Sequence, residues 1–322
     1  MMLSYSIAIR TLGTAGEKYL EELRSITRQT IQPEKVVVYI AQGYKRPKEQ
    51  IGIEEYVWVQ KGMMAQRALP YNEITSDCIL LLDDDVLLAP DSAEQLLKAL
   101  EDNNADCVGA DTFKNQDMSL KGKIFAAITN LVFPRPDDGW AFKIHRNGSF
   151  SYNNHPQSNY YPSQSCAGPC ALWRKEAFLK MHLEDELWCE HQGFWYGEDV
   201  LLFYKLHLNG GRLGILYNAG VTHMDGKTAS EAHHENIKKF YIRSKASTII
   251  WHRTIWCVRP TCVAALLFII KQLWLFIVNC FAGLVLLKPG IPILFIRGIR
   301  DAYRFIISDS HRLLPPFVDR NH

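Results

Sequence analysis

The sequence predicts an α/β fold: a mostly parallel sheet with helices on both faces, followed by a C-terminal membrane-associated helical region. Three observations support this prediction. Short β-rich runs alternate with helical periodicity through the first half of the chain. One of these runs, Cys78–Leu82, is apolar throughout, which is typical of a strand buried on both faces. A long apolar stretch occurs near the C-terminus, at residues 263–287.

The first half of the chain divides into strands and helices in a regular order. The expected strands cover about residues 4–10, 36–40, 56–59 and 79–82. One expected helix begins near Glu17, and a second covers about residues 62–69. A third follows Asp91, which with Glu94 three residues later can form a capping pair. Strands that alternate with helices favour parallel pairing within one sheet.

Residues 111–165 are irregular and aromatic, and their Gly, Pro and Asn content predicts loops over the sheet. Within them, two β-rich runs flank Asn147-Gly148, a pair that suits the type I′ turn of a hairpin. The same turn explains the glycosylation-type motif that ends at Ser149. Regular structure then returns, with strands expected at 171–173, 215–217 and 221–223 and helices at 175–181 and 200–208.

Composition limits the kinds of partner and compartment. The chain has 322 residues, 48% of them hydrophobic and 22% charged, and its net charge of +2 gives no case for nucleic acid. Of its eight cysteines, Cys166 and Cys170 stand close together, but no second pair has zinc-site spacing. We therefore expect reduced thiols and a cytosolic compartment. The N-terminus begins as a strand and predicts no signal peptide.

Three consecutive carboxylates, Asp83–Asp85, follow the apolar strand directly. Because burying unpaired charge is costly, they must emerge at the strand's C-terminal edge, where open α/β sheets bind their ligands. Clustered oxygen ligands suggest a divalent cation, and the cation suggests a phosphate-bearing substrate. The alternative is a solvated acidic turn, since Asp is common in turns. The long apolar run before the triplet favours the site.

The C-terminal apolar stretch indicates a membrane. Residues 263–287 exceed the roughly 20 residues that span a bilayer. However, Lys271 lies near the middle, where a charge is expensive. A spanning helix and a bent pair of interfacial helices are therefore both open, and a buried helix pair in a soluble protein is the third alternative. Basic residues before the stretch favour a cytoplasmic catalytic part attracted to anionic lipid, and residues 293–307 suit a surface-lying helix.

Taken in order, these motifs resemble the family 2 glycosyltransferases of the GT-A (Rossmann-like) fold, of the bacterial polysaccharide-biosynthesis type. The resemblance covers about residues 4–225. It rests on Ser6–Thr11, Gln29-Thr30 with Pro33, Lys61-Gly62 with Ala65–Arg67, Asp83–Asp85, Gly168 before Leu172–Phe178, Gly197–Asp199 and His223. It implies a glycosyltransferase domain at 1–225 and a basic, apolar, membrane-associated tail at 226–322.

The resemblance implies a nucleotide-sugar donor held through Mn²⁺ or Mg²⁺. Asp85 would ligate the metal directly, and Asp83 would face the ribose or the metal's waters. His223 matches a position that can ligate the metal, although a histidine after a strand is as often simply packed. Arg10, Thr11 and Arg67 match nucleotide-contacting positions, and Gln42 stands where a base edge is read. The family usually has an acidic residue near Gln42, so the nucleotide stays open. Asp83 is also among the residues expected to contact the nucleotide-sugar donor.

For the acceptor, the resemblance implies that Asp199 is the catalytic base, with Glu198 beside it. Trp195 and Tyr196 could stack on an acceptor sugar, or they could be ordinary packing residues. A base beside a donor fits inverting transfer to an acceptor hydroxyl. One long apolar segment suits transfer of a single sugar better than extrusion of a polymer.

The predicted function is transfer of one sugar to a lipid-linked glycan acceptor at the cytoplasmic side of the cell inner membrane, in cell-surface polysaccharide synthesis. The expected partners are the donor, a glycan or lipid-linked saccharide, and membrane lipid. One alternative is a non-catalytic membrane scaffold, since Ala68 replaces the usual Asn of the family. A nucleotidyltransferase is the weakest alternative, because Gly13–Gly16 is a poor phosphate loop.

Overall fold

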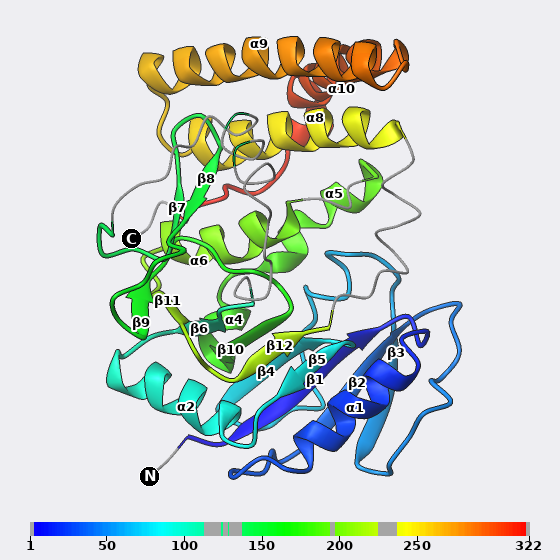
Figure 1. Ribbon diagram of the computed structural model, residues 1–322, viewed down its shortest axis with the longest axis vertical. Helices are drawn as coiled ribbons and strands as arrows, with labels where there is room; N and C mark the ends of the chain where they lie inside the picture. The colour runs from blue at the N-terminus through cyan, green and yellow to red at the C-terminus, as the bar shows by residue number, and fades with distance from the viewer. Residues whose placement is uncertain are drawn as a thin grey trace.

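The computed structural model describes residues 3–112, 124, 128, 137–193, 197–224 and 237–319. Its centre is an eight-stranded sheet of order β3-β2-β1-β4-β10-β6-β11-β9 (Figure 1). The strands are β1 Tyr5–Thr11, β2 Val36–Ala41, β3 Glu54–Val59, β4 Cys78–Asp83, β6 Cys107–Ala110, β9 Tyr160–Pro162, β10 Cys170–Arg174 and β11 Leu213–Leu216. Only β9 and β10 run antiparallel to their neighbours in this sheet. The predicted α/β fold with a mostly parallel sheet is confirmed.

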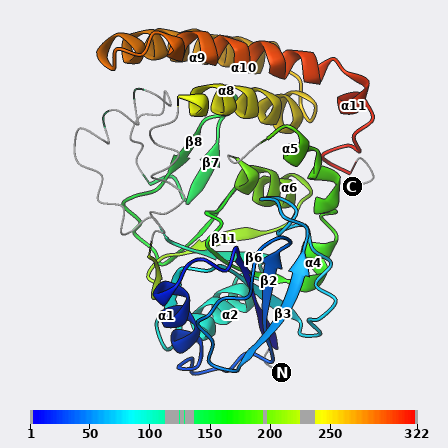
Figure 2. The same ribbon diagram turned by 90° about the vertical axis from the view of Figure 1, so that its right-hand side faces the viewer.

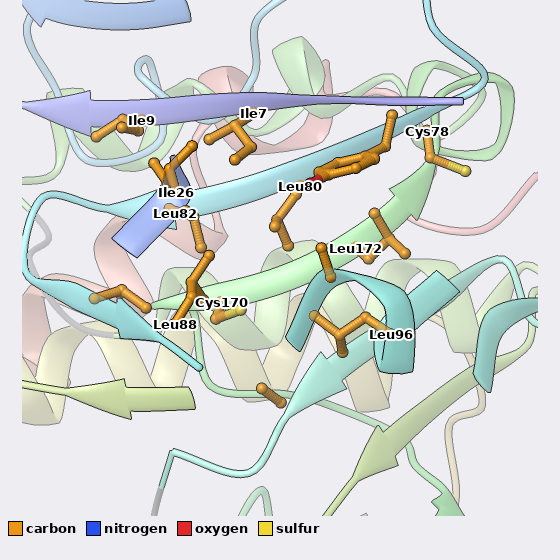
Figure 3. Packing of buried hydrophobic residues seen from close by; sticks show 14 of the residues in the cluster. Ile7, Ile9, Ile26, Cys78, Leu80, Leu82, Leu88, Leu96, Cys170 and Leu172 are labelled. Atoms are coloured by element: carbon orange, nitrogen blue, oxygen red, sulfur yellow. The ribbon is translucent and has the colours of Figure 1, made fainter. Parts of the chain in front are cut away.

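Alternate residues of the strands pack on opposite faces of the sheet. Leu80 and Leu82 of β4 face α1 (Glu17–Ile26) and α2 (Ser92–Asp102), where they join one core cluster (Figure 3). Ile79 and Leu81 face the other way, toward a second cluster. That cluster includes side chains of α4 Lys175–Leu179, the π-helix η2 Val200–Tyr204 and α6 Lys205–Leu208. Both faces are therefore covered, as the continuous apolar run of β4 requires.

Two local predictions are wrong, the helix at 62–69 and the cap at Asp91. Residues 63–67 form successive turns rather than a helix, and the N–H groups of Met64 and Ala65 donate to the carboxylate of Glu190 at 2.5 and 3.0 Å. The start of α2 carries no cap from Asp91. Instead, the Ala93 N–H donates to the side chain of Gln29 at 3.0 Å.

The predicted hairpin is confirmed, with β7 (Phe142–Ile144) paired to β8 (Phe150–Tyr152). Its turn is not type I′, which needs positive φ at both central residues. Gly148 has φ +73°, but Asn147 does not have positive φ, and the loop is longer than two residues. Strands β5 (Val86–Leu88), β6 and β9 were not predicted, because three or four residues are too few to show a period.

The tail is a layer of helices above the sheet domain (Figures 1 and 2). It comprises α8 Lys238–Trp251, the π-helix η3 His252–Trp256, α9 Cys262–Val285, α10 Gly290–Ile306 and α11 Asp309–Arg312. The apolar stretch forms one helix, α9, so the bent pair is wrong. It is the one helix of the described chain long and apolar enough to cross a membrane.

One face of α9 packs on the protein and the others are exposed. Phe268 stacks on Trp251 of α8 with ring centroids 3.9 Å apart, and Lys271, next on the same face, is 7% exposed. By contrast, Phe281 is 68% and Leu284 74% exposed. Lys271 therefore points into the protein and not into the surroundings of the helix.

Candidate active site

The ends of β1 and β4 bring an arginine and an aspartate together. Arg10 and Asp83 stand opposite each other in the parallel register of the two strands. The Arg10 guanidinium lies 2.6 Å from the Asp83 carboxylate and donates to the Gly168 carbonyl at 3.0 Å. Arg10 is 6% exposed, and its Nε and Nη1 make no hydrogen bond within the described chain. At this edge of the sheet, a buried arginine therefore has N–H groups that can still donate to a ligand.

Arg67 joins this pair to the predicted base. Its Nη2 lies 3.9 Å from Asp83 Oδ1 and 3.7 Å from Glu198 Oε1. The turn that carries Arg67 is bound by Glu190 of α5 (Trp188–His191), which accepts from the N–H groups of Met64 and Ala65. Glu190 was not predicted as part of the site. No local pattern indicates it, because it lies more than a hundred residues from Met64 along the chain.

The acidic triplet turns from β4 into β5, and its members separate. Asp84 accepts a hydrogen bond from the Thr11 hydroxyl, and burial raises the pKa of Asp84 to about 6. The Asp85 carboxylate lies 3.0 Å from the His223 Nε2, because β5 pairs with β12 (Val221–His223). The hydroxyl of Thr11 also accepts from the Gly13 N–H at 2.7 Å.

The oxygen and imidazole ligands at this turn suit a divalent ion. Asp85 and His223 come from different strands and already lie side by side. Within the described residues, no group of three His, Cys, Asp or Glu converges, so the protein alone offers an incomplete coordination shell. Phosphate oxygens and water normally complete such a shell for Mg²⁺. The residues present therefore fit a metal that binds together with a diphosphate.

Asp199 lies just beyond the arginines, at the start of η2. Its Oδ2 accepts the Gly168 N–H at 3.2 Å, and its Oδ1 is buried with no hydrogen bond in the described chain. Burial and the neighbouring Glu198 raise the pKa of Asp199 to about 7, although Arg67 and Arg10 oppose the shift. A carboxyl that titrates near neutral pH can take and release a proton under physiological conditions. A Cβ at residue 168 would lie 2.5 Å from Asp199 Oδ1, so any larger residue there would displace this carboxylate.

A cavity of about 290 Å³ opens on the far side of Asp199. The β7–β8 hairpin forms one wall, Glu198 and Asp199 form the second, and α8 and α9 form the third. Its lining includes Lys271 of α9, which sequence analysis considered as an obstacle to membrane insertion and not as a site residue. The tail thus completes a pocket that begins at the predicted base.

Of the remaining predicted residues, Gln42 is exposed just after β2, next to β1 in the sheet. The structure shows no contact between its side chain and the Arg10 cluster. Trp195 and Tyr196 lie outside the described residues. All eight cysteines are free, including the buried Cys166 and Cys170.

A mostly parallel α/β sheet with acidic, arginine and histidine side chains beyond the carboxyl ends of its strands has the general arrangement of an α/β ligand-binding fold. Residues 37–181 match the family described as glycosyl transferase family 2. The matched segment, residues 37–181, is thus similar to a glycosyltransferase domain of that family.

Two solved structures are similar in fold. One is GalNAc-T7 with UDP, GalNAc and Mn²⁺, at 14% identity and TM-score 0.47, covering 69% of this chain and 43% of that chain. The other is the mannosyltransferase PcManGT from Pyrobaculum calidifontis in complex with GDP-Man and Mn²⁺, at 12% identity and TM-score 0.47, covering 94% of this chain and 88% of that chain. No curated protein matches the chain significantly.

Proposed function

We propose that the protein is a metal-dependent, inverting glycosyltransferase. It would move one sugar from a nucleotide-diphosphate sugar to a hydroxyl of a lipid-linked glycan, in cell-surface polysaccharide synthesis. One observation carries the proposal: the buried Asp199 stands between the Arg10–Asp83 cluster and a separate cavity, with one oxygen unpaired. A group in that position can face a donor on one side and an acceptor on the other.

The donor would lie at the edge of β1 and β4. Arg10 and Arg67 are buried guanidinium groups, and such groups bind phosphate oxygens through charge-assisted hydrogen bonds. Thr11 and Gln42 would contact the nucleoside of the donor. Asp85 and His223, with Asp83, would hold Mn²⁺ or Mg²⁺. When bound, the ion would neutralise negative charge on the diphosphate leaving group.

Asp199 would act as the general base. As the acceptor oxygen attacks the anomeric carbon, its proton passes to the carboxylate of Asp199 and the bond to the diphosphate breaks. The Gly168 N–H holds Oδ2, which leaves Oδ1 for the proton. Glu198 raises the pKa of the base and holds Arg67. Attack opposite the leaving group inverts the anomeric configuration, as the resemblance to the family implies.

The membrane part of the proposal rests on the tail. We divide the chain into a catalytic domain, 1–225, and a membrane-associated tail, 226–322. The exposed apolar side chains of α9 are joined by those of α10, including Ile293 at 55% and Ile296 at 50% exposure. Because the opposite face of α9 packs on the protein, α9 would lie in the interface of the cytoplasmic leaflet of the cell inner membrane and would not cross it.

Donor turnover by the full-length protein in nonionic detergent tests the proposal. Thermal shifts with a panel of nucleotide sugars and Mn²⁺ would first select the donor. EDTA should then abolish transfer, and added Mn²⁺ should restore it. Asp85→Asn and Asp199→Asn should each lower turnover strongly, whereas Asp102→Asn, an exposed change on α2, should not.

Unchanged activity in both site variants would refute the assignment. Metal-dependent nucleotide binding without transfer to any acceptor would instead favour the scaffold alternative. NMR of the product's anomeric configuration tests inversion separately, and a retained configuration would overturn that part of the proposal. Protease accessibility of the C-terminus in sealed vesicles tests whether α9 lies on the membrane or crosses it.

A further inference from the structure

Lys271 is a buried cation in a helix that is otherwise apolar. It is 7% exposed, near the middle of the 24 residues of α9. Its ammonium contacts the Asn147 carbonyl at 3.4 Å, at the turn of the β7–β8 hairpin. Within the described chain, no carboxylate lies within ion-pair distance of it. A buried ammonium with a single weak hydrogen bond is costly, so its position calls for a partner that the described residues do not supply.

The cavity that Lys271 lines also contains the proposed base. Asp199 Oδ1 and the Ser165 hydroxyl are both buried there without a hydrogen bond in the described residues. The rest of the lining is largely apolar, including the stacked rings of Phe142 and Phe150, 4.8 Å apart, and Trp251. A few polar groups in an apolar pocket are typical of a site that orients one ligand.

The position of the cavity indicates what such a ligand must look like. The pocket lies between the catalytic domain and α9, whose outer residues form the exposed apolar surface of the tail. A ligand that fills it presents a hydroxyl to Asp199 and an anion to Lys271. Its apolar part can then follow α9 to the surface. A neutral, fully soluble sugar would leave Lys271 unpaired.

We propose that Lys271 binds the phosphate of the acceptor, and that the acceptor is a saccharide or alcohol carried on a lipid phosphate. This inference rests on the proposed function, since it assigns the acceptor side of the same site. Lys271 would thus be a specificity-determining residue contributed by the tail. It would also explain why the tail packs on the catalytic domain at this pocket.

Binding of farnesyl phosphate to the full-length protein in nonionic detergent tests the proposal without any turnover. Isothermal titration of the wild type, Lys271→Met and Lys271→Arg would give the affinities. A lost charged hydrogen bond should weaken binding about 10- to 100-fold in Lys271→Met, and Lys271→Arg should recover part of it. Lys288→Met, an exposed change on the same tail, is the matched control and should bind like the wild type.

Two further ligands identify the chemistry that is recognised. Farnesol, which lacks the anion, should bind weakly and equally to the wild type and Lys271→Met. Inorganic phosphate should not displace farnesyl phosphate at comparable concentration. Equal affinity of the wild type and Lys271→Met for farnesyl phosphate would overturn the proposal. Displacement by inorganic phosphate would overturn its lipid part, leaving a plain anion site.

The result can be separated from the fate of the proposed function. Lys271→Met should retain metal-dependent nucleotide-sugar binding, because Lys271 lies on the acceptor side of Asp199. If the wild type bound no nucleotide sugar, the proposed function would be contradicted. The binding of lipid phosphate by Lys271 would not be affected by that result. The thermal unfolding temperature of Lys271→Met should equal or exceed that of the wild type, since the substitution removes a buried charge that has no ion-pair partner in the described chain. Selective loss of lipid-phosphate binding in a folded variant is thus the outcome expected.

Discussion

Two buried ionic clusters in this molecule use the same residue types with opposite results. In the first, Glu186 is 0% exposed and accepts from Arg253 at 2.6 and 2.7 Å and from Trp188 at 2.7 Å. Lys205 adds a fourth contact at 3.3 Å. In the second, Arg10, Arg67 and Asp83 meet beside Asp199. Arg10 Nε and Nη1, Arg67 Nε and Asp199 Oδ1 are buried without hydrogen bonds in the described chain.

The difference appears in the titration of the two carboxyls. Burial raises the pKa of Glu186, but the hydrogen bonds and charge of Arg253, with Lys205, outweigh it and leave that pKa below its ordinary value. Burial and Glu198 raise the pKa of Asp199 to about 7, because its arginine neighbours are shared with other acids. A satisfied cluster stabilises a structure, here the junction of the tail with the catalytic domain. An unsatisfied one is a candidate site for a ligand.

The largest expected effect is on turnover. Asp199→Asn keeps the size of the side chain and removes the base, so transfer should fall about 10²- to 10⁴-fold. Stability should stay equal or rise, because a poorly paired buried carboxyl is replaced by a neutral amide. Turnover and urea unfolding of the same preparation would check both. A loss of stability matching the loss of activity would mean that Asp199 is structural.

The Glu186 cluster should respond in the opposite way. Glu186→Gln leaves Arg253 buried without its partner, and breaking a buried pair costs about 3–5 kcal/mol of unfolding free energy. Turnover per folded molecule should be nearly unchanged under native conditions. Urea denaturation with a parallel activity assay measures the two quantities. A large loss of turnover in fully folded protein would place this cluster in the catalytic machinery and remove the contrast.

A smaller effect is expected at the contact that orients the base. Gly168→Ala places a methyl group 2.5 Å from Asp199 Oδ1, and such overpacking costs about 1–3 kcal/mol. The displaced carboxylate should lower turnover about tenfold or more, within the range expected for misplaced catalytic groups. Gly290→Ala is the matched control, since its nearest neighbour would be an ordinary 3.7 Å away. If both variants behave alike, Gly168 does not position the base.

The mildest test changes no residue and follows the pH dependence of turnover. Because Asp199 must be unprotonated to act and its pKa is about 7, turnover should fall about tenfold per pH unit as pH drops below 7. The rate profile of the wild type, with donor saturating, measures this. A flat profile between pH 5 and 8 would contradict the assignment of the base.

The contributions of the two clusters to the free energy of unfolding should depend on pH in opposite directions. The folded-state pKa of Asp199 is raised from 3.8 to about 7, so the native state binds the extra proton and gains stability as pH falls through that window. The pKa of Glu186 is lowered, so its contribution is present above its ordinary pKa and is lost as pH falls further. Unfolding curves of Asp199→Asn and Glu186→Gln, each compared with the wild type between pH 2 and 8, would separate them.

The sequence alone determined most of the strands and helices and one end of the site. The apolar run of β4 and the carboxylates after it are local patterns, and they correctly place Asp83 at the edge of a buried strand. The resemblance added Arg10, Arg67 and Asp199, which the structure brings together. Patterns of this kind are readable because strand and helix periods act over a few residues.

Only the tertiary structure decided what those residues touch. The predicted helix at 62–69 forms turns instead, and the buried N–H groups of Met64 and Ala65 there donate to the distant Glu190. Strand pairing brings His223 to Asp85, and helix packing brings Lys271 to the cavity of Asp199. These contacts join residues far apart in the chain, and they follow from how the layers bury their apolar faces, which no local period encodes.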